Sequence, residues 1–169
     1  MGQAKGSHRQ FDYNNRYSIA PVLKYLIDDN TAITLEYTHQ FSQVNMIGTN
    51  YAFSKKGYAD LPKDFTTGEG NFDPTNMNDK SLLIVFDHKI NDNWKFRGQG
   101  AYFNYTQVGM SMWPDAITGA DENIMTRRVY ISEDYAIAKT GQFYVNGEEK
   151  TGNVNHKILA GIDLSDKIN

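Results

Sequence analysis

The residues that could do metal or acid–base chemistry are spread along the chain without the spacing of a known site. The four histidines, His8, His39, His88 and His156, fall in different segments and lack the short spacing of paired zinc ligands. Residues 73–79, Asp-Pro-Thr-Asn-Met-Asn-Asp, supply side-chain oxygens but lack the glycine and terminal glutamate of a calcium loop. We therefore predict no metal site, and we interpret His39 and His88 as packing residues.

The sequence also gives no indication of nucleophilic or general acid–base catalysis. Glu36 and Asp87 are carboxylates in separate segments, and no histidine is positioned by the sequence to work with them. The chain contains no Gly-x-Ser-x-Gly motif and no glycine-rich phosphate loop. It also contains no cysteine, which excludes a thiolate nucleophile and a disulfide scaffold. The sequence predicts a protein that has no catalytic residues and is not an enzyme.

The composition limits the class of protein. The chain has 169 residues, which corresponds to one domain or a piece of one. Its formal net charge of −3 gives no basic surface, so we expect no nucleic-acid partner. Aromatic residues make up 13% of the chain, which argues against disorder. No run of eighteen apolar residues is present, so the sequence predicts no transmembrane helix, although membrane strands carry a weaker signal.

The dominant pattern is alternation of apolar and polar side chains, which is the period of a β-strand. It is clear in 17–27, 33–41, 82–90 and 94–102, and weaker in 125–149 and 158–164. Each segment therefore has one apolar face and one polar face. Polar-face residues include Lys24, Glu36, Asp87 and Arg97. No capped helix of three turns is visible, and we predict an all-β fold.

The connections between these segments are unequal in length. Tight turns are predicted at 28–30, 91–93 and 150–154, long polar loops at 45–79 and 107–124, and a shorter connection near 13–16. In an antiparallel meander, successive connections lie at opposite ends of the strands. All tight turns would then lie at one end and all long loops at the other, which is typical of outer-membrane barrels. A strand of about eleven residues, rising about 3.3 Å per residue and tilted by about 40°, also spans the apolar band of such barrels.

The number of strands leaves alternatives open. We count about six strands, and a polar N-terminal stretch could form part of a seventh. A closed membrane barrel needs at least eight strands, and unpaired edges in hydrocarbon cost several kcal/mol per orphan amide. Either the chain is a slice of a larger barrel, or it contains unrecognised strands. In the second case it would be a small stand-alone barrel, eight-stranded in the outer membrane or soluble and lipocalin-like, with a structural or ligand-binding role.

Several short motifs occur in a fixed order along nearly the whole chain. They are residues 17–21, 61–65, 68–69, 72–73, 88–97, 126–128, 151–156 and 159–163. Together they resemble TonB-dependent ferric-siderophore receptors of the ferrichrome-receptor type. Each motif is loose alone, but their order and spacing make the set specific.

This resemblance implies a 22-stranded transmembrane β-barrel built as an antiparallel up-and-down meander. Residues 1–169 would be an internal fragment that supplies about six to seven of its strands, with the plug domain and the C-terminal strands absent. It implies a location in the outer membrane of a Gram-negative bacterium, in contact with lipid. The implied partners are a ferric siderophore and, through the absent plug, the TonB complex. No cofactor is implied, because iron enters only as part of the siderophore.

The resemblance also implies a ligand site of aromatic side chains. Tyr51 and Phe53 in the first long loop match ligand-facing positions of the family, and Trp113, with Met112 and Tyr105, falls in the corresponding part of the second. Such a site needs flat apolar surfaces rather than metal ligands, because the chelate already ligates the iron fully. The alternative interpretation is that these aromatic residues pack the loops onto one another. Which siderophore is bound stays open.

Overall fold

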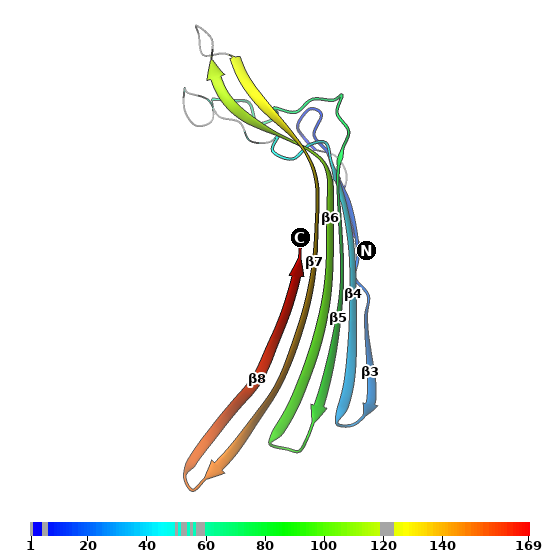
Figure 1. Ribbon diagram of the computed structural model, residues 1–169, viewed down its shortest axis with the longest axis vertical. Helices are drawn as coiled ribbons and strands as arrows, with labels where there is room; N and C mark the ends of the chain where they lie inside the picture. The colour runs from blue at the N-terminus through cyan, green and yellow to red at the C-terminus, as the bar shows by residue number, and fades with distance from the viewer. Residues whose placement is uncertain are drawn as a thin grey trace. The chain divides into compact units, whose positions relative to one another are not determined.

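The computed structural model describes residues 2–4, 7–49, 51, 54, 56, 60–118 and 124–169, with residues 2–4 described by their backbone alone (Figure 1). These residues form one antiparallel sheet, so the all-β prediction is confirmed. Its strands are β1 (Gly2–Ala4), β2 (Asn14–Ile19), β3 (Val22–Asp28), β4 (Thr31–Val44), β5 (Thr75–Lys89), β6 (Trp94–Thr118), β7 (Ile124–Thr151) and β8 (Val154–Ile168). Within the described ranges there is no helix long and apolar enough to cross a membrane.

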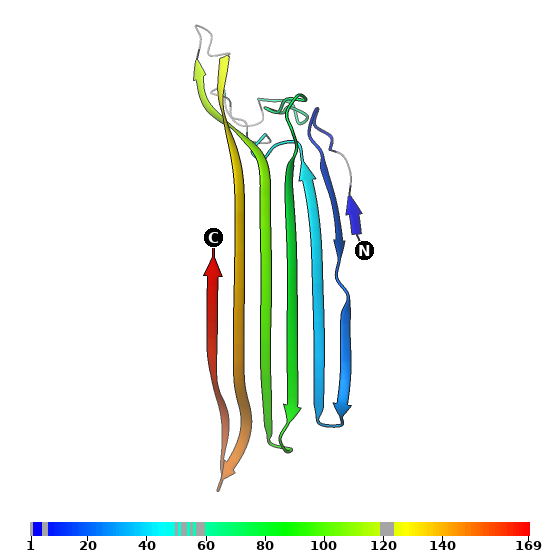
Figure 2. The ribbon, with the colours of Figure 1, turned by 45° about the vertical axis from the view of Figure 1, so that its right-hand side comes forward.

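The strands follow one another as a meander, which confirms the predicted topology. Their order in the sheet is β1-β2-β4-β5-β6-β7-β8, and Figure 2 shows β4 to β7 side by side in chain order. β2 and β3 both pair with β4, and Ala20 and Pro21 separate them. Proline has no backbone N–H and interrupts a ladder. Its carbonyl still takes part, because the backbone N–H of Tyr37 donates to Pro21 O at 3.1 Å.

The chain divides into two compact units, each of which holds part of the long strands. Unit 1 comprises Met1–Ser18, Gln40–Asn78 and Thr106–Tyr135, and unit 2 comprises Ile19–His39, Asp79–Tyr105 and Ala136–Asn169. The three predicted tight turns belong to unit 2. The long connection between β4 and β5 belongs to unit 1.

The three tight turns form where the sequence predicts them. Asp and Asn side chains can accept hydrogen bonds from nearby backbone N–H groups, and glycine tolerates a positive φ. In the first, Asp28 Oδ1 accepts a hydrogen bond from the backbone N–H of Asn30 at 2.7 Å. In the second, Asn91 Oδ1 accepts one from the backbone N–H of Trp94 at 2.9 Å. In the third, Gly152 takes a φ of +60°, a left-handed conformation that glycine adopts at little cost. These short turns fix the register of the strands that they join.

The register between β3 and β4 separates two faces of unit 2. Leu23 lies opposite Leu35 on one face, and Lys24 lies opposite Thr34 on the other. Every residue of β3 is exposed, and the side chain of Leu23 is 66% exposed. The two strands thus have an exposed apolar face on one side and a polar face on the other, as the alternation predicts.

The same division holds between β7 and β8. Phe143 lies opposite Ile162 on the apolar face, and Gln142 lies opposite Asp163 on the polar face. Lys139 breaks the apolar pattern of β7 in the sequence. The register places Lys139 opposite Asp166 on β8, so a positive and a negative side chain lie across from each other on this face.

Several predicted boundaries are wrong. The region 107–124 is mostly strand rather than loop, because β6 continues to Thr118 and β7 begins at Ile124. Similarly, β5 begins at Thr75, so the first long connection is shorter than predicted, and residues 14–16 lie in β2. Residues 14–16 and 75–79 carry mostly polar side chains on both faces, so alternation does not mark them as strand. In 107–118, Val108, Met110 and Met112 do alternate with polar or small residues, but Gly109 and Pro114 are unfavourable in strands. Gln107 Nε2 donates to Asp134 Oδ2 across β6 and β7 at 3.3 Å.

Candidate functional site

The first residues of the long connection between β4 and β5 (residues 45–74) are attached to the C-terminal part of β6. Ile47 forms an isolated parallel bridge with Ser111. Its N–H donates to Met110 O at 3.1 Å, and its carbonyl accepts from the N–H of Met112 at 2.8 Å. Met46 and Met112 are buried, at 4% and 2% exposure. The first residues of the connection are therefore held on β6 by backbone bonds and by buried thioethers.

A turn at Gly48 then brings Tyr51 against Trp113. Gly48 has a φ of +89°, and a Cβ there would lie 2.6 Å from Met112 O and 3.0 Å from the Trp113 ring. The N–H of Tyr51 donates to Gly48 O at 3.0 Å, which closes the turn. The rings of Tyr51 and Trp113 have centroids 5.1 Å apart and planes inclined by 33°. Because Tyr51 is 58% and Trp113 37% exposed, the pair presents an aromatic surface to solvent.

The structure thus brings together some of the predicted site residues but not all. Tyr51 and Trp113 are in contact, and Met112 is buried next to Trp113 in β6. Tyr105 lies in the unit 2 part of β6, and Phe53 lies outside the described residues. The ring contact packs the connection onto β6, as the alternative interpretation predicts, and still leaves part of both rings accessible. Contact of these residues with a ligand stays a prediction.

Threonines of the connection form a hydrogen-bond network with Asp12. The hydroxyls of Thr49 and Thr66 donate to Asp12 Oδ1 at 3.0 and 3.2 Å. The backbone N–H and the hydroxyl of Thr67 both donate to Thr49 O, at 3.0 and 2.9 Å. Thr49 and Thr67 are 4% and 3% exposed. This network joins Thr49 and Thr67, two residues of the connection that are 18 positions apart in sequence.

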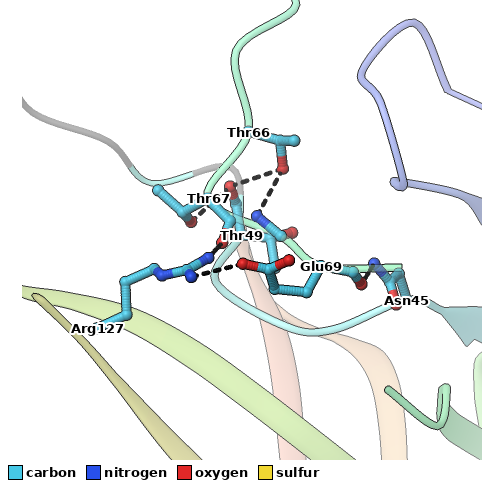
Figure 3. Close-up of polar contacts among 7 residues, drawn as sticks. Asn45, Thr49, Thr66, Thr67, Glu69 and Arg127 are labelled. Atoms are coloured by element: carbon cyan, nitrogen blue, oxygen red, sulfur yellow. Dashed lines mark hydrogen bonds and ion pairs between the residues drawn. The ribbon is translucent and has the colours of Figure 1, made fainter. Parts of the chain in front are cut away.

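Arg127 of β7 joins this network from the neighbouring strand (Figure 3). One guanidinium nitrogen donates to Thr67 O at 2.5 Å, and another lies 2.5 Å from Glu69 Oε1. The Glu69 carbonyl in turn accepts from the side-chain amide of Asn45 at 2.9 Å. Sequence reasoning did not select Glu69 or Arg127 as site residues. The available signal was that both stand in motifs on which the family resemblance rests, at 68–69 and 126–128.

A groove of about 480 Å³ opens beside this ion pair, within unit 1. Its lining combines the Glu69–Arg127 pair with thioether and apolar side chains. The lining residues are Glu69, Asn71, Phe72, Met112, Met125, Arg127 and Val129. Such a surface can hold an organic molecule with apolar and polar parts. Across the described part of the chain, no three His, Cys, Asp or Glu side chains are grouped so that they could hold a metal ion.

His88, for which a packing role is predicted, contacts one side chain on the neighbouring strand and one on its own. Its Nδ1 lies 3.0 Å from the hydroxyl of Thr31 on the neighbouring strand. Its ring stacks with Phe86, with centroids 6.3 Å apart.

No protein-family model matches the chain. Curated receptors do match its sequence, among them the following two. It is 27% identical over 173 residues to the ferrioxamine receptor of Yersinia enterocolitica, a match that covers 96% of the chain and 23% of the receptor. It is 25% identical over 158 residues to the ferrioxamine B receptor of Salmonella typhimurium, covering 91% of the chain and 22% of that protein.

Solved structures give the same picture of the fold. The ferric-catecholate import receptor Fiu of E. coli K12, in its open form, matches 98% of the chain with a TM-score of 0.77 and 17% identity. The siderophore receptor PiuA of Acinetobacter baumannii matches 92% with a TM-score of 0.75 and 19% identity. The chain therefore has the fold of part of the barrels of these receptors. The resemblance drawn from the sequence motifs is therefore confirmed.

The match is to part of a receptor barrel. The chain spans 23% of the length of the Yersinia receptor and 28% of the Fiu chain. Each of these named proteins is a receptor, in agreement with the prediction that the chain belongs to a receptor and not to an enzyme. In the chain, Tyr51 lies on the connection after β4, and Trp113 lies near the end of β6.

Proposed function

We propose that the chain is an internal segment of the barrel of an outer-membrane receptor, which binds a ferric siderophore and imports it with energy from TonB. The observation that carries this proposal is the agreement of two matches over nearly the whole chain. The sequence match covers 96% of it and is to a ferrioxamine receptor, and the fold match covers 98% of it and is to a ferric-catecholate receptor. A plug domain elsewhere in the whole protein would contact TonB.

The two faces of unit 2 suit a barrel wall. The apolar face, with Leu23 and Leu35 side by side, would contact lipid. The polar face, where Arg97 Nε lies 2.5 Å from Asp87 Oδ1, would line the water-filled interior. In the described sheet, β8 forms one edge. An edge in hydrocarbon must be paired, because each unpaired amide costs several kcal/mol. Further strands of the same barrel would supply that pairing.

The ligand-binding role falls to exposed aromatic side chains in unit 1. Tyr51 and Trp113 form a ring pair that is partly exposed to solvent, and Met112, the neighbour of Trp113 in β6, is buried. A ferric siderophore offers the protein an organic surface, because its own oxygens fill the coordination sphere of the iron. Aromatic faces and a few hydrogen-bond donors can hold such a ligand without a resident cofactor or metal. Phe53, which lies outside the described residues, and Tyr105, which belongs to unit 2, stay predictions from the family resemblance.

The alternative of a small stand-alone barrel is not favoured. A stand-alone barrel with a structural or ligand-binding role would have no reason to match siderophore receptors in both sequence and fold. The sequence matches suggest ferrioxamine as the first chelate to test, because the Yersinia and Salmonella receptors are named for it.

The proposal is tested by iron uptake with the complete gene. The gene is expressed in a Gram-negative host that lacks its own siderophore receptors, and uptake of radioactive iron is measured with ferrioxamine B, ferrichrome and a ferric catecholate. We expect the protein in the outer-membrane fraction and uptake with at least one chelate, lost in a host without TonB. Correct insertion in the outer membrane without uptake of any chelate would refute the siderophore role.

A further inference from the structure

We propose that Arg127 is a positioning residue for ligand binding: it fixes the connection between β4 and β5 so that Tyr51 and Trp113 form one preformed surface. The inference rests on the proposed siderophore-binding function and adds to it a residue that does not belong to the aromatic set. Three structural steps lead from the guanidinium to the aromatic pair.

The first step is the contact of Arg127 with two acceptors on the connection. Its guanidinium reaches both Thr67 O and Glu69 Oε1 at 2.5 Å, so it holds two positions of one short segment at once. The Arg127 side chain is 32% exposed, which limits competition from water. A planar guanidinium suits this two-pronged contact, whereas an ammonium group is a single point charge.

The second step passes from Thr67 to Thr49. The carbonyl of Thr67 accepts from Arg127, while its N–H and its hydroxyl both donate to Thr49 O. Both threonines are almost fully buried. Displacement of Thr67 would therefore leave the Thr49 carbonyl without two of its hydrogen-bond donors.

The third step passes from Thr49 to the aromatic pair. Thr49 lies inside the turn that the hydrogen bond from Tyr51 N to Gly48 O closes at 3.0 Å. That turn sets the Tyr51 ring on Trp113 of β6. β6 and β7 are neighbours in the sheet, so the path from Arg127 to Trp113 begins and ends on adjacent strands. A surface held in this way loses little conformational entropy when a ligand binds.

The test compares Arg127→Ala and Arg127→Lys with the matched control Arg128→Ala in the complete receptor in detergent micelles. Arg128 is the next residue of β7, but it contacts Asp115 at 2.9 Å, and both side chains are about half exposed. Three quantities are measured: affinity for the chelate that the uptake test selects, hydrogen exchange of peptides covering 60–70, and the thermal unfolding midpoint.

We expect Arg127→Ala to weaken chelate binding about tenfold, equivalent to about 1.4 kcal/mol. Hydrogen exchange of 60–70 should become faster while the unfolding midpoint of the barrel stays unchanged. Arg127→Lys should restore part of the affinity, because it keeps the charge but only one of the two contacts. Arg128→Ala should match the wild type in all three measurements.

Two results would overturn the inference. One is an Arg127→Ala receptor that binds as the wild type does, with unchanged exchange. The other is a loss of binding accompanied by an equal loss of thermal stability, since Arg127 would then support the barrel as a whole. A wild-type receptor that binds no chelate would instead refute the proposed function, and the exchange data would still show whether Arg127 holds the connection.

Discussion

The indole ring of Trp94 on β6 occupies the space that a side chain at Gly147 on β7 would need. Gly147 is buried, although its neighbours Asn146 and Glu148 are exposed. The Trp94 Nε1–H also donates to Glu149 Oε1 at 2.5 Å. The ring therefore lies across two strands close to a tight turn, and it covers backbone that would otherwise be open.

Gly147→Ala should destabilise the protein, because the new Cβ would overlap the Trp94 ring and force it away. We expect a loss of about 1–3 kcal/mol in the free energy of unfolding, as is usual for overpacking. The measurement is urea unfolding of the complete protein in detergent micelles. Gly141→Ala on the same strand is the control, since a Cβ there would lie 3.7 Å from the Phe143 ring, an ordinary contact. Equal stability of the two variants would contradict the prediction.

The sequence could predict the strands of unit 2 and their turns, because both depend on local patterns. Alternation marks the faces of β3 and β4, and the Asp and Asn side chains at 28 and 91 mark the turns. It could not predict that Trp94 lies over Gly147, because this contact depends on the register between strands that are far apart in the chain. The sequence also does not predict the segment 107–118 as strand, because Gly109 and Pro114, which are unfavourable in strands, interrupt its alternation.

Thr75 at the start of β5 should tolerate serine but not valine. Its hydroxyl donates to Met110 O at 2.6 Å and accepts from Met110 N at 2.8 Å, and the residue is 0% exposed. Valine has nearly the same shape but removes the acceptor of the Met110 N–H and leaves Met110 O with the Ile47 N–H as its remaining donor, which costs about 1–3 kcal/mol. The expected result is a lower urea midpoint for Thr75→Val than for Thr75→Ser. A serine variant as unstable as the valine variant would show that the methyl group matters more than the hydroxyl.

Gly48→Ala should weaken ligand binding without unfolding the barrel. The left-handed backbone disfavours alanine, and the new Cβ would meet both Met112 O and the Trp113 ring, so the turn that carries Tyr51 must move. We expect an affinity loss similar to that of Trp113→Ala, about tenfold, measured by chelate titration.

The control for the Gly48→Ala titration is Gly152→Ala, which introduces backbone strain without a steric clash. Gly152 also has a positive φ, but a Cβ there would meet no atom within 4 Å. It should leave the affinity unchanged. If Gly48→Ala bound the chelate as tightly as Gly152→Ala, the aromatic pair would have no part in binding.

The candidate site was predictable only in part, for a related reason. Family motifs placed Tyr51 and Trp113 on adjacent loops of the expected barrel, and the structure brings their rings together. The Glu69–Arg127 pair joins residues 58 positions apart, and no local pattern in the sequence connects them. Such a pairing follows from the path of the connection between β4 and β5 over β7, which only the structure shows.

The turn between β5 and β6 should show a pH-dependent ion pair. The Lys89 ammonium lies 2.6 Å from Asp92 Oδ1, and this contact lowers the pKa of Asp92 below its usual 3.8. Since the pKa is lowered by folding, the pair stabilises the turn above the unfolded pKa, and its contribution is lost as the pH falls through the folded value. NMR titration of the labelled Asp92 carboxyl in micelles should give a pKa below 3.8, and Lys89→Gln should raise it toward that value. Lys150→Gln, at the end of β7 beside another tight turn, should leave the pKa of Asp92 unchanged. A titration that Lys89→Gln does not shift would mean that the ion pair does not persist in solution.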